Sequence, residues 1–305
     1  DEKTTTKTDS ENDEPIVFQP NLVAIEKCQF NVKKGEYKDI KFGNLHANLT
    51  LTKAGVLEIK SNKFDFAEGI STLKVYCDLA KEKYSIRLGA KDVESNLIAS
   101  TMLNLPNEIS GKSKALLEFY TDHNAKLNGS IRFAINDGSI TKLGLVQYVL
   151  NMAALFRNPI VMISPSTIVD LVNIPEGSFK LINGEMKIRN NVIERMVIKS
   201  SSPQLSSFIV GHIDLETFDS SLRIYTKFSN KHKGFAGFLR GLSLNALAKK
   251  ASSFTSPPEE VSYYASELSQ LPKLETGEEN AQVFLTTVDG DVQTTNFLSS
   301  LKKVK

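Results

Sequence analysis

Short runs of alternating apolar and polar side chains cover most of this 305-residue chain. Alternation with a period of two is typical of β-strands, because successive side chains leave opposite faces. Such runs predict strands at 44–52, 55–66, 71–79, 83–90, 114–121, 129–140, 177–188, 195–201, 206–215 and 220–228. Most connections are too short for parallel crossovers. The pattern therefore predicts a mainly β fold: a long curved antiparallel meander of at least eight strands that forms a groove or an open sandwich.

Turn-forming residues suggest where the strands reverse. Asn-Asp-Gly at 136–138 and Asn-Gly at 183–184 tolerate the positive φ angles of tight hairpins, so we expect a turn at each. The segments 129–140 and 177–186 also share a Gly-Ser start, an apolar residue, a basic residue and a glycine. This weak repeat indicates a structural unit that can be added several times.

A few amphipathic helices are expected at the ends of the sheet or over its open side. Apolar stripes predict helices at 143–156, 165–173 and 235–250. A fourth begins after Pro258 and runs to about Leu271, with Val261, Tyr264, Leu268 and Leu271 on one side. The expected organisation is a disordered polar linker at 1–15, one β domain at 16–250, and a C-terminal helix and tail at 251–305.

Composition narrows the class of protein. A hydrophobic fraction of 41% and a charged fraction of 24% are ordinary for a folded globular chain. A net charge of +2 does not favour nucleic acid as a partner. The most apolar window, 143–156, is too short to span a bilayer, and the first fifteen residues lack the pattern of a signal peptide. These residues resemble a linker that follows a removed upstream anchor.

The sequence contains no recognisable catalytic or metal-binding motif. His46, His123, His212 and His232 are scattered, and none has a second ligand at metal-binding spacing. Cys28 and Cys77 do not form a Cys-x-x-Cys pair, and they either stay reduced or form one disulfide. Nucleophile-elbow, zinc-protease and dinucleotide fingerprints are missing. We therefore predict no enzyme activity, catalytic residue, metal or cofactor.

Two stretches, 127–145 and 177–228, resemble the C-terminal region of the AsmA-like family, within the repeating β-groove group of bridge-like lipid-transfer proteins. The matching residues are Asp137, Gly138, Gly184, Gly211, Asp214, Leu215, Asp219 and Leu222. The upstream stretch 43–69, followed by 91–103, is similar to the strand, turn and short helix of that family. The resemblance covers roughly residues 35–250.

The resemblance implies an envelope protein that is anchored in the inner membrane by an upstream helix and has its β-rich part in the periplasm. Its expected partners are phospholipid, which it would carry between inner and outer membranes, and other envelope proteins. The residues expected to line the lipid groove are Phe133, Ile135, Phe179, Leu181, Met186, Ile188, Ile213, Leu215, Leu222, Ile224 and Phe228.

The same alternation fits a second interpretation. The apolar face can instead be the filled core of a closed sandwich, in which case the chain is an assembly scaffold or protein-binding module that uses exposed strand edges. Within 221–228, the groove interpretation predicts that Leu222, Ile224 and Phe228 face the apolar side. Arg223, Tyr225 and Lys227 are then expected to face solvent.

Overall fold

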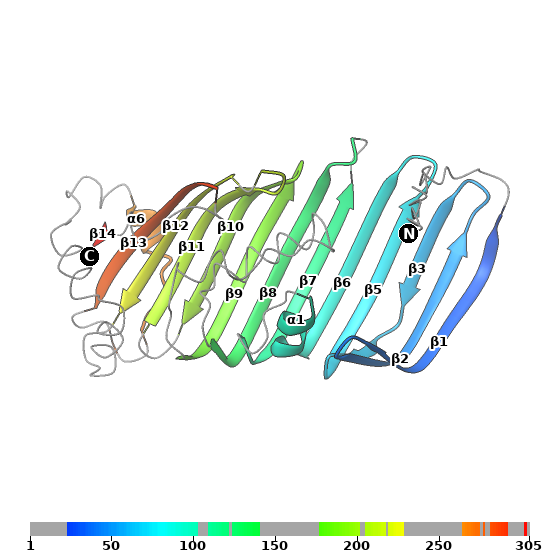
Figure 1. Ribbon diagram of the computed structural model, residues 1–305, viewed down its shortest axis with the longest axis horizontal. Helices are drawn as coiled ribbons and strands as arrows, with labels where there is room; N and C mark the ends of the chain where they lie inside the picture. The colour runs from blue at the N-terminus through cyan, green and yellow to red at the C-terminus, as the bar shows by residue number, and fades with distance from the viewer. Residues whose placement is uncertain are drawn as a thin grey trace, which may run out of the picture.

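The computed structural model shows one antiparallel sheet that extends across the long axis of the molecule (Figure 1). The structure describes residues 23–102, 109–121, 124–140, 177–201, 205–217, 219–228, 264–274, 277, 281–291 and 302–303. The sheet has 14 strands in the order β1-β2-β3-β5-β6-β7-β8-β9-β10-β11-β12-β13-β14, and β4 pairs with β2 and β5 beside this path. The predicted mainly β class is confirmed.

The strands cover every run that the alternation predicts. Their bounds are β1 Ile25–Tyr37, β2 Ile40–Leu51, β3 Val56–Ser61, β4 Phe64–Phe66, β5 Gly69–Asp78, β6 Lys83–Glu94, β7 Lys112–Thr121, β8 Leu127–Ile140, β9 Gly177–Arg189, β10 Val192–Ser201, β11 Leu205–Asp214, β12 Asp219–Phe228, β13 Gln282–Asp291 and β14 Lys302–Lys303. Two short helices, α1 (Ser95–Met102) and α6 (Ala265–Leu268), complete the described elements.

Nearly every strand pairs with its neighbour in the sequence, and all the pairings are antiparallel. β8 pairs with β9 although residues 141–176 separate them, and β12 pairs with β13 although 229–281 lie between them. The predicted meander is therefore confirmed. It continues through β13, beyond the residue at which we expected the β domain to end.

Tight turns with positive φ connect several of these strands, but not at the predicted positions. Asn190 and Asn191, with φ of 51° and 66°, join β9 to β10. The turns predicted at 136–138 and 183–184 are wrong, because both segments lie inside long strands that pair on both sides. Asp137 does have a positive φ of 46°, but β8 continues through it to Ile140 without reversing.

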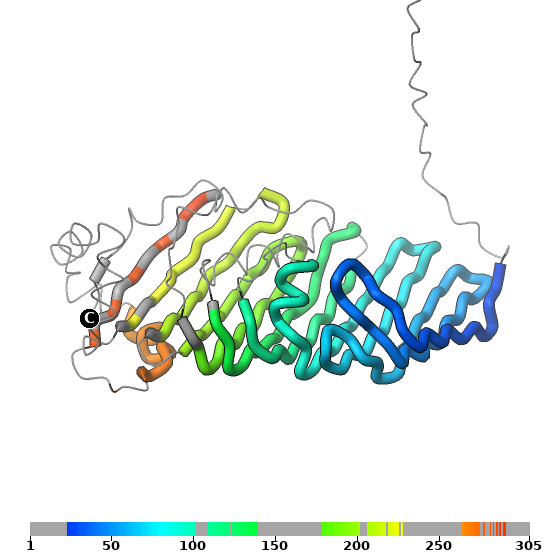
Figure 2. The backbone as a smooth tube through the Cα atoms, turned by 60° about the horizontal axis from the view of Figure 1, so that its bottom comes forward, coloured from blue at the N-terminus to red at the C-terminus, as the bar shows by residue number. Residues whose placement is uncertain are grey.

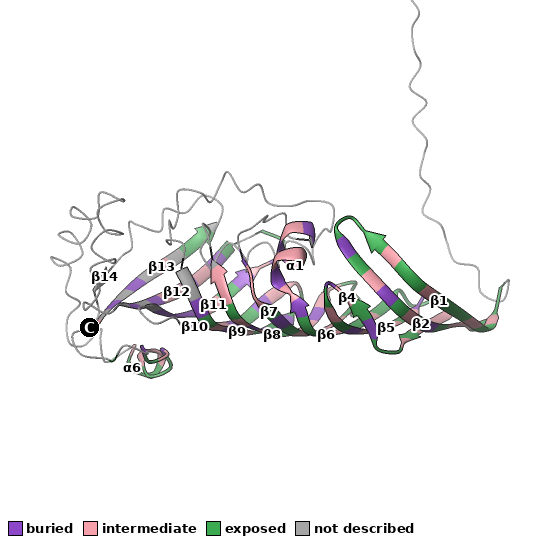
Figure 3. Cartoon of the chain, turned by 90° about the horizontal axis from the view of Figure 1, so that it is seen from below, coloured by how far each residue is buried: buried purple, intermediate pink, exposed green. Residues whose placement is uncertain are grey.

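The sheet is curved, so it has a concave and a convex face (Figures 2 and 3). α1 lies on the concave side, where Leu97 and Ile98 pack on a buried cluster formed by Ile40, Ala67 and Val93. α6 lies on the convex side, at the end formed by β10 to β13. Each helix therefore covers only part of one face.

The structure tests only one of the four predicted helices. The helices expected at 143–156, 165–173 and 235–250 lie outside the described residues, as does the expected linker at 1–15. The described part of the fourth begins at Tyr264, and within 264–271 the helix is Ala265–Leu268. Tyr264, Leu268 and Leu271 nevertheless pack into one cluster, as their spacing predicted.

Candidate functional site

The register of the sheet aligns apolar side chains from many strands into rows. Directly paired residues of an antiparallel ladder point to the same face, so register partners form a continuous line across strands. The first row runs from β2 to β11 and consists of Leu49, Ile59, Val75, Ile86, Phe119, Gly129, Ile188, Ile193 and Ile213. Adjacent strands are about 4.8 Å apart, so this row is about 38 Å long.

Two further rows lie beside the first on the same face. The second contains Leu73, Leu88, Leu117, Ile131, Met186, Met196, Gly211, Leu222 and Val288. The third contains Ala90, Ala115, Phe133, Gly184, Ile198, Ile209 and Ile224. We call the three rows together the apolar face. Ala90, from the third row, packs on the same buried cluster as Leu97 and Ile98 of α1, which places this face on the concave side.

Large side chains cover two glycines within these rows. A Cβ atom at Gly184 would lie 2.4 Å from Cε1 of Phe133, its register partner on β8. A Cβ atom at Gly211 would lie 2.9 Å from Cδ2 of Leu222, its partner on β12. The neighbouring side chain therefore occupies the space that the glycine leaves, and the row stays apolar at both points.

The accessibility of the apolar face changes along the sheet (Figure 3). Its part in β8 to β12 is buried, with Ile188 at 2% and Ile213 at 0% exposure. Its part in the earlier strands is much more open, and Ile86 is 44% exposed. The exposed Tyr84 and Phe30 have register partners, Cys77 and Ala47, on this same side. The face is thus a closed core toward one end and an accessible apolar surface toward the other.

Most of the predicted groove residues lie on the apolar face. Phe133, Met186, Ile188, Ile213, Leu222 and Ile224 belong to its rows, and Ile135 pairs with Ile182 beside them. Ile224 is half-buried and the others are buried. Leu215 is buried just beyond the end of β11, where its N–H donates to the carbonyl of Asn191. The side chain of Phe228 lies outside the described part.

The prediction for Leu181 is wrong. Because β9 continues straight through 183–184, Leu181 alternates with the buried Ile182 and leaves the opposite face. Phe179 has the same phase as Leu181, and is buried against Gly138. The predicted single face for Phe179, Leu181, Met186 and Ile188 required a turn in the middle of the strand.

The predicted solvent exposure of the other side of β12 is also wrong. Tyr225 is 0% exposed and Lys227 is 8% exposed. Segment 264–274 covers this side, where Tyr225 packs with Phe208, Leu271, Val283 and Leu285. The ammonium of Lys227 donates to the carbonyl of Pro272 at 3.1 Å. A segment some forty residues later in the chain therefore creates a second core on the convex face.

A charged network fixes this segment to β12. The guanidinium of Arg223 donates from Nε and Nη2 to the two carboxylate oxygens of Glu267, at 2.8 and 2.6 Å. The hydroxyl of Tyr225 donates to Oε2 of Glu267 at 2.5 Å. Burial acts to raise the pKa of Glu267, but these hydrogen bonds and the charge of Arg223 outweigh it and hold the pKa below its usual value. Burial, followed by the bond to Glu267, raises the pKa of Tyr225.

Among the described residues, the remaining candidate groups show no catalytic arrangement; His123 and His232 lie outside them. Cys28 and Cys77 are free thiols, and burial raises the pKa of Cys77. His212 is exposed, and His46 interacts with Asn31 and Asn62. Within the described ranges, no three His, Cys, Asp or Glu side chains come together as metal ligands. No helix in these same ranges has the length and hydropathy needed to cross a membrane.

Sequence reasoning missed the open half of the apolar face. Leu49, Ile59, Val75, Ile86 and Leu88 occur in alternating runs that did predict strands, but nothing within a run shows which residues of other strands it will face. The alternation was the signal for each strand, but the register between strands, which aligns the apolar residues into rows, was missing. Comparisons with protein-family models, curated proteins and solved structures find no match to this chain.

Proposed function

We propose that the apolar face binds the acyl chains of phospholipids and supports their movement along the sheet. The observation that carries this proposal is the continuity of the three rows: the first crosses from β2 to β11, the second from β5 to β13 and the third from β6 to β12, and none contains a charged residue. A row of about 38 Å is longer than the hydrocarbon core of a bilayer, which is about 30 Å. An acyl chain can therefore lie along its accessible part, in β2 to β7, whereas the part in β8 to β11 is already buried.

The energetic reason for such a surface is the cost of moving an acyl chain through water. Each buried methylene contributes about 0.8 kcal/mol, so a chain of roughly fourteen methylenes resists exposure by about 11 kcal/mol. A sheet with apolar residues on one side lowers this cost along its whole length. The exposed Ile86 and Tyr84 provide apolar surface at which a chain can enter.

The cellular setting belongs to the same proposal. We place the protein in the periplasm of a bacterial envelope, attached to the inner membrane through an upstream anchor, where it supports phospholipid transport between inner and outer membranes. It acts without catalytic residues. This placement follows from the resemblance to AsmA-like proteins, and the apolar face supplies its physical basis.

Photo-crosslinking tests the proposal directly. A crosslinking side chain at Ile86, on the open part of the apolar face, should capture phospholipid in the periplasm. The matched control is Lys74, an exposed residue of the neighbouring strand β5, whose register partner Arg87 lies on the convex side. Lipid captured at Ile86 but not at Lys74 supports the proposal, and equal capture at both positions contradicts it. Ile224, a half-buried residue of the third row, extends the test toward the buried half.

Lipid extraction gives an independent test. Protein purified without detergent should release phospholipid that mass spectrometry detects. A Leu88→Lys substitution places an ammonium in the second apolar row at a half-buried position, and it should reduce the amount of bound lipid while the protein stays folded. An unchanged lipid content in the folded Leu88→Lys protein would contradict the proposal that the apolar face binds lipid.

A specific observation favours a second candidate function, protein binding. β1 is a 13-residue strand at one end of the described sheet, and β2 is its only partner there. Its outer edge carries free backbone donors and acceptors that another strand can pair with. A pull-down that recovers one specific partner, lost when Asn31→Pro removes a backbone donor from this edge, together with lipid-free protein, would favour the scaffold interpretation.

A further inference from the structure

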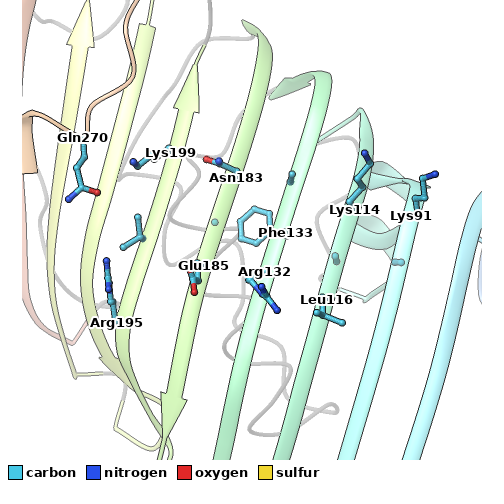
Figure 4. Close-up of a pocket in the computed structure, with 15 residues that line it drawn as sticks. Lys91, Lys114, Leu116, Arg132, Phe133, Asn183, Glu185, Arg195, Lys199 and Gln270 are labelled. Atoms are coloured by element: carbon cyan, nitrogen blue, oxygen red, sulfur yellow. The ribbon is translucent and has the colours of Figure 1, made fainter. Parts of the chain in front are cut away.

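A basic trough lies mainly on the convex face, and four residues of the third apolar row, Ala90, Ala115, Phe133 and Gly184, also border it (Figure 4). Its volume is about 720 Å³, and it lies over β6 to β10 next to Gln270, which follows α6. Lys91, Lys114, Arg132, Arg195 and Lys199 supply its cationic side chains, and Glu185 is its one carboxylate. In the close-up, Lys91 and Lys114 lie together at one end, with Arg195 and Lys199 toward the other.

Most of these cations lack an acidic partner, whereas several other cations of the sheet have one. Arg87 pairs with Glu118, Arg189 with Glu194, and Lys126 with Glu216. Within the described residues, no carboxylate lies within 4.0 Å of the charged nitrogens of Lys114, Arg132 or Arg195. Lys91 is 3.8 Å from Asp92, and Lys199 lies over the ring of Phe208. Positive charge is therefore concentrated in a chain that is nearly neutral overall.

The register explains why the charges converge. Lys114, Ala134, Asn183 and Lys199 are successive partners across β7 to β10, so a lysine stands at each end of a row with a small residue and an amide between them. In the adjacent row, Leu116, Arg132, Glu185 and Val197 are partners. The two lysines are three strands apart, or about 14 Å. A ligand that contacts both ends must carry more than one negative group.

The residue types favour phosphate over carboxylate. Arginine offers a planar fork of donors that binds phosphate oxygens in pairs, and lysine supplies point charges that phosphates accept from several directions. Asn183, between the two lysines, and Gln270 add neutral amide donors to the lining. We propose that this trough binds a polyphosphorylated anion, with its phosphates distributed between the β6–β7 end and the β10 end. Acidic lipid headgroups and soluble polyphosphates share this chemistry.

Calorimetric titration of the protein with linear inorganic polyphosphate tests the site. Polyphosphate should bind more tightly than orthophosphate, because only the longer anion reaches both ends, and added salt should weaken the binding. The triple variant Lys114→Gln, Arg132→Gln, Arg195→Gln should lose roughly tenfold or more in affinity. The control Lys74→Gln, Lys83→Gln changes exposed lysines outside the trough and should bind as the parent protein does.

Vesicles identify the source of the phosphates. Phosphatidylcholine vesicles that contain phosphatidic acid should sediment with the protein and be displaced by polyphosphate if the ligand is a lipid headgroup. If only polyphosphate binds, the site serves a soluble phosphorylated compound. Absence of polyphosphate binding, equal losses in the triple variant and the control, or equally tight binding of poly-glutamate would overturn the proposal.

Two further measurements distinguish anion binding in the trough from a structural role of the same residues and from lipid binding on the apolar face. Removing mutually repelling cations should leave the melting temperature of the triple variant unchanged or higher, whereas a structural role would lower it. Lipid crosslinking at Ile86 should also persist in that variant, because the trough opens on the other face. The proposal for the trough and the proposal for the apolar face can therefore be contradicted or supported independently.

Discussion

The ring of Phe133 lies across Gly184, its register partner on the adjacent strand, so closely that a Cβ atom at 184 would be 2.4 Å from Cε1 of the ring. Gly184→Ala should therefore destabilise the protein by about 1–3 kcal/mol, because the ring must leave its position. Urea denaturation measures the change. Gly89→Ala is the control, since its Cβ atom would meet only the hydroxyl of Thr72.

A double-mutant cycle connects this effect to the ring. Phe133→Leu should cost about 1 kcal/mol alone, and combining it with Gly184→Ala should cost less than the sum of the two single changes, because the smaller side chain leaves space for the new methyl group. Strict additivity would show that the alanine acts through the backbone of β9 and not through Phe133.

The bond network of Glu267 predicts a loss of stability in acid. Its folded pKa lies below the unfolded value near 4.5, so its contribution is complete above that value and is lost as pH falls through the folded pKa. The free energy of unfolding of the parent protein should fall more steeply below pH 4.5 than that of Glu267→Gln. Parallel pH profiles for the two proteins would contradict the role assigned to this carboxylate.

The raised pKa of Tyr225 predicts a loss of stability in alkali. Its pKa is raised, so the folded protein holds this proton more tightly than the unfolded chain does. The stability it contributes is complete below the unfolded pKa near 10 and declines above it. Tyr225→Phe should remove this alkaline decline and cost about 1.5–3 kcal/mol near neutral pH, the range for a hydrogen bond to a charged group. Denaturation midpoints between pH 7 and 11 provide the measurement.

The graded burial of the apolar face predicts different effects for the same substitution. Ile213→Lys puts a charge at a 0% exposed site and should prevent folding or cost several kcal/mol. Ile86→Lys, at a 44% exposed site in the same row, should cost about 1 kcal/mol or less. Circular dichroism and thermal melting distinguish the two. Equal destabilisation would mean that the open half is covered in solution.

The turn at 190–191 predicts a loss of local bonds. The side chain of Asn191 accepts from the N–H of Leu127 at 2.6 Å and donates to Oε1 of Glu216 at 2.6 Å, and its φ is 66°. Asn191→Ala should cost about 1–3 kcal/mol, and Asn191→Gly should cost less because glycine tolerates positive φ. If the two variants are equally stable, backbone strain contributes nothing here, and the side-chain bonds account for the whole effect.

The sequence predicted strands better than turns, and the reason is local. Alternation near Met186 and Ile188 required only adjacent residues, so β9 was found. The Asn-Gly pair at 183–184 satisfied the same hairpin rule as Asn190–Asn191, and only long-range pairing distinguishes them. β9 has 13 residues, longer than a typical strand, which favoured dividing it in two.

The errors at the candidate site also arise because the residues that contact one another there are far apart in the sequence. The segment Arg223–Lys227 has the pattern of a polar surface, and its burial depends on Glu267 and Pro272. The three apolar rows exist only because β2 to β12 pair in a particular register. Alternation shows that each strand has an apolar side, but the alignment of those sides into rows comes from contacts between strands.

The neighbour-to-neighbour pairing of the strands has a mechanical consequence. β1 and β14 lie at opposite ends of the described sheet, so tension applied between these two strands passes through all the ladders of hydrogen bonds in series, and the weakest ladder yields first. Strands of such a sheet detach one after another from its ends, and the sheet does not shear as a single unit. Because each strand contacts mainly its neighbours, a chain stretched between two attachment points could yield at a terminal strand while the central ladders β6 to β11 remain paired.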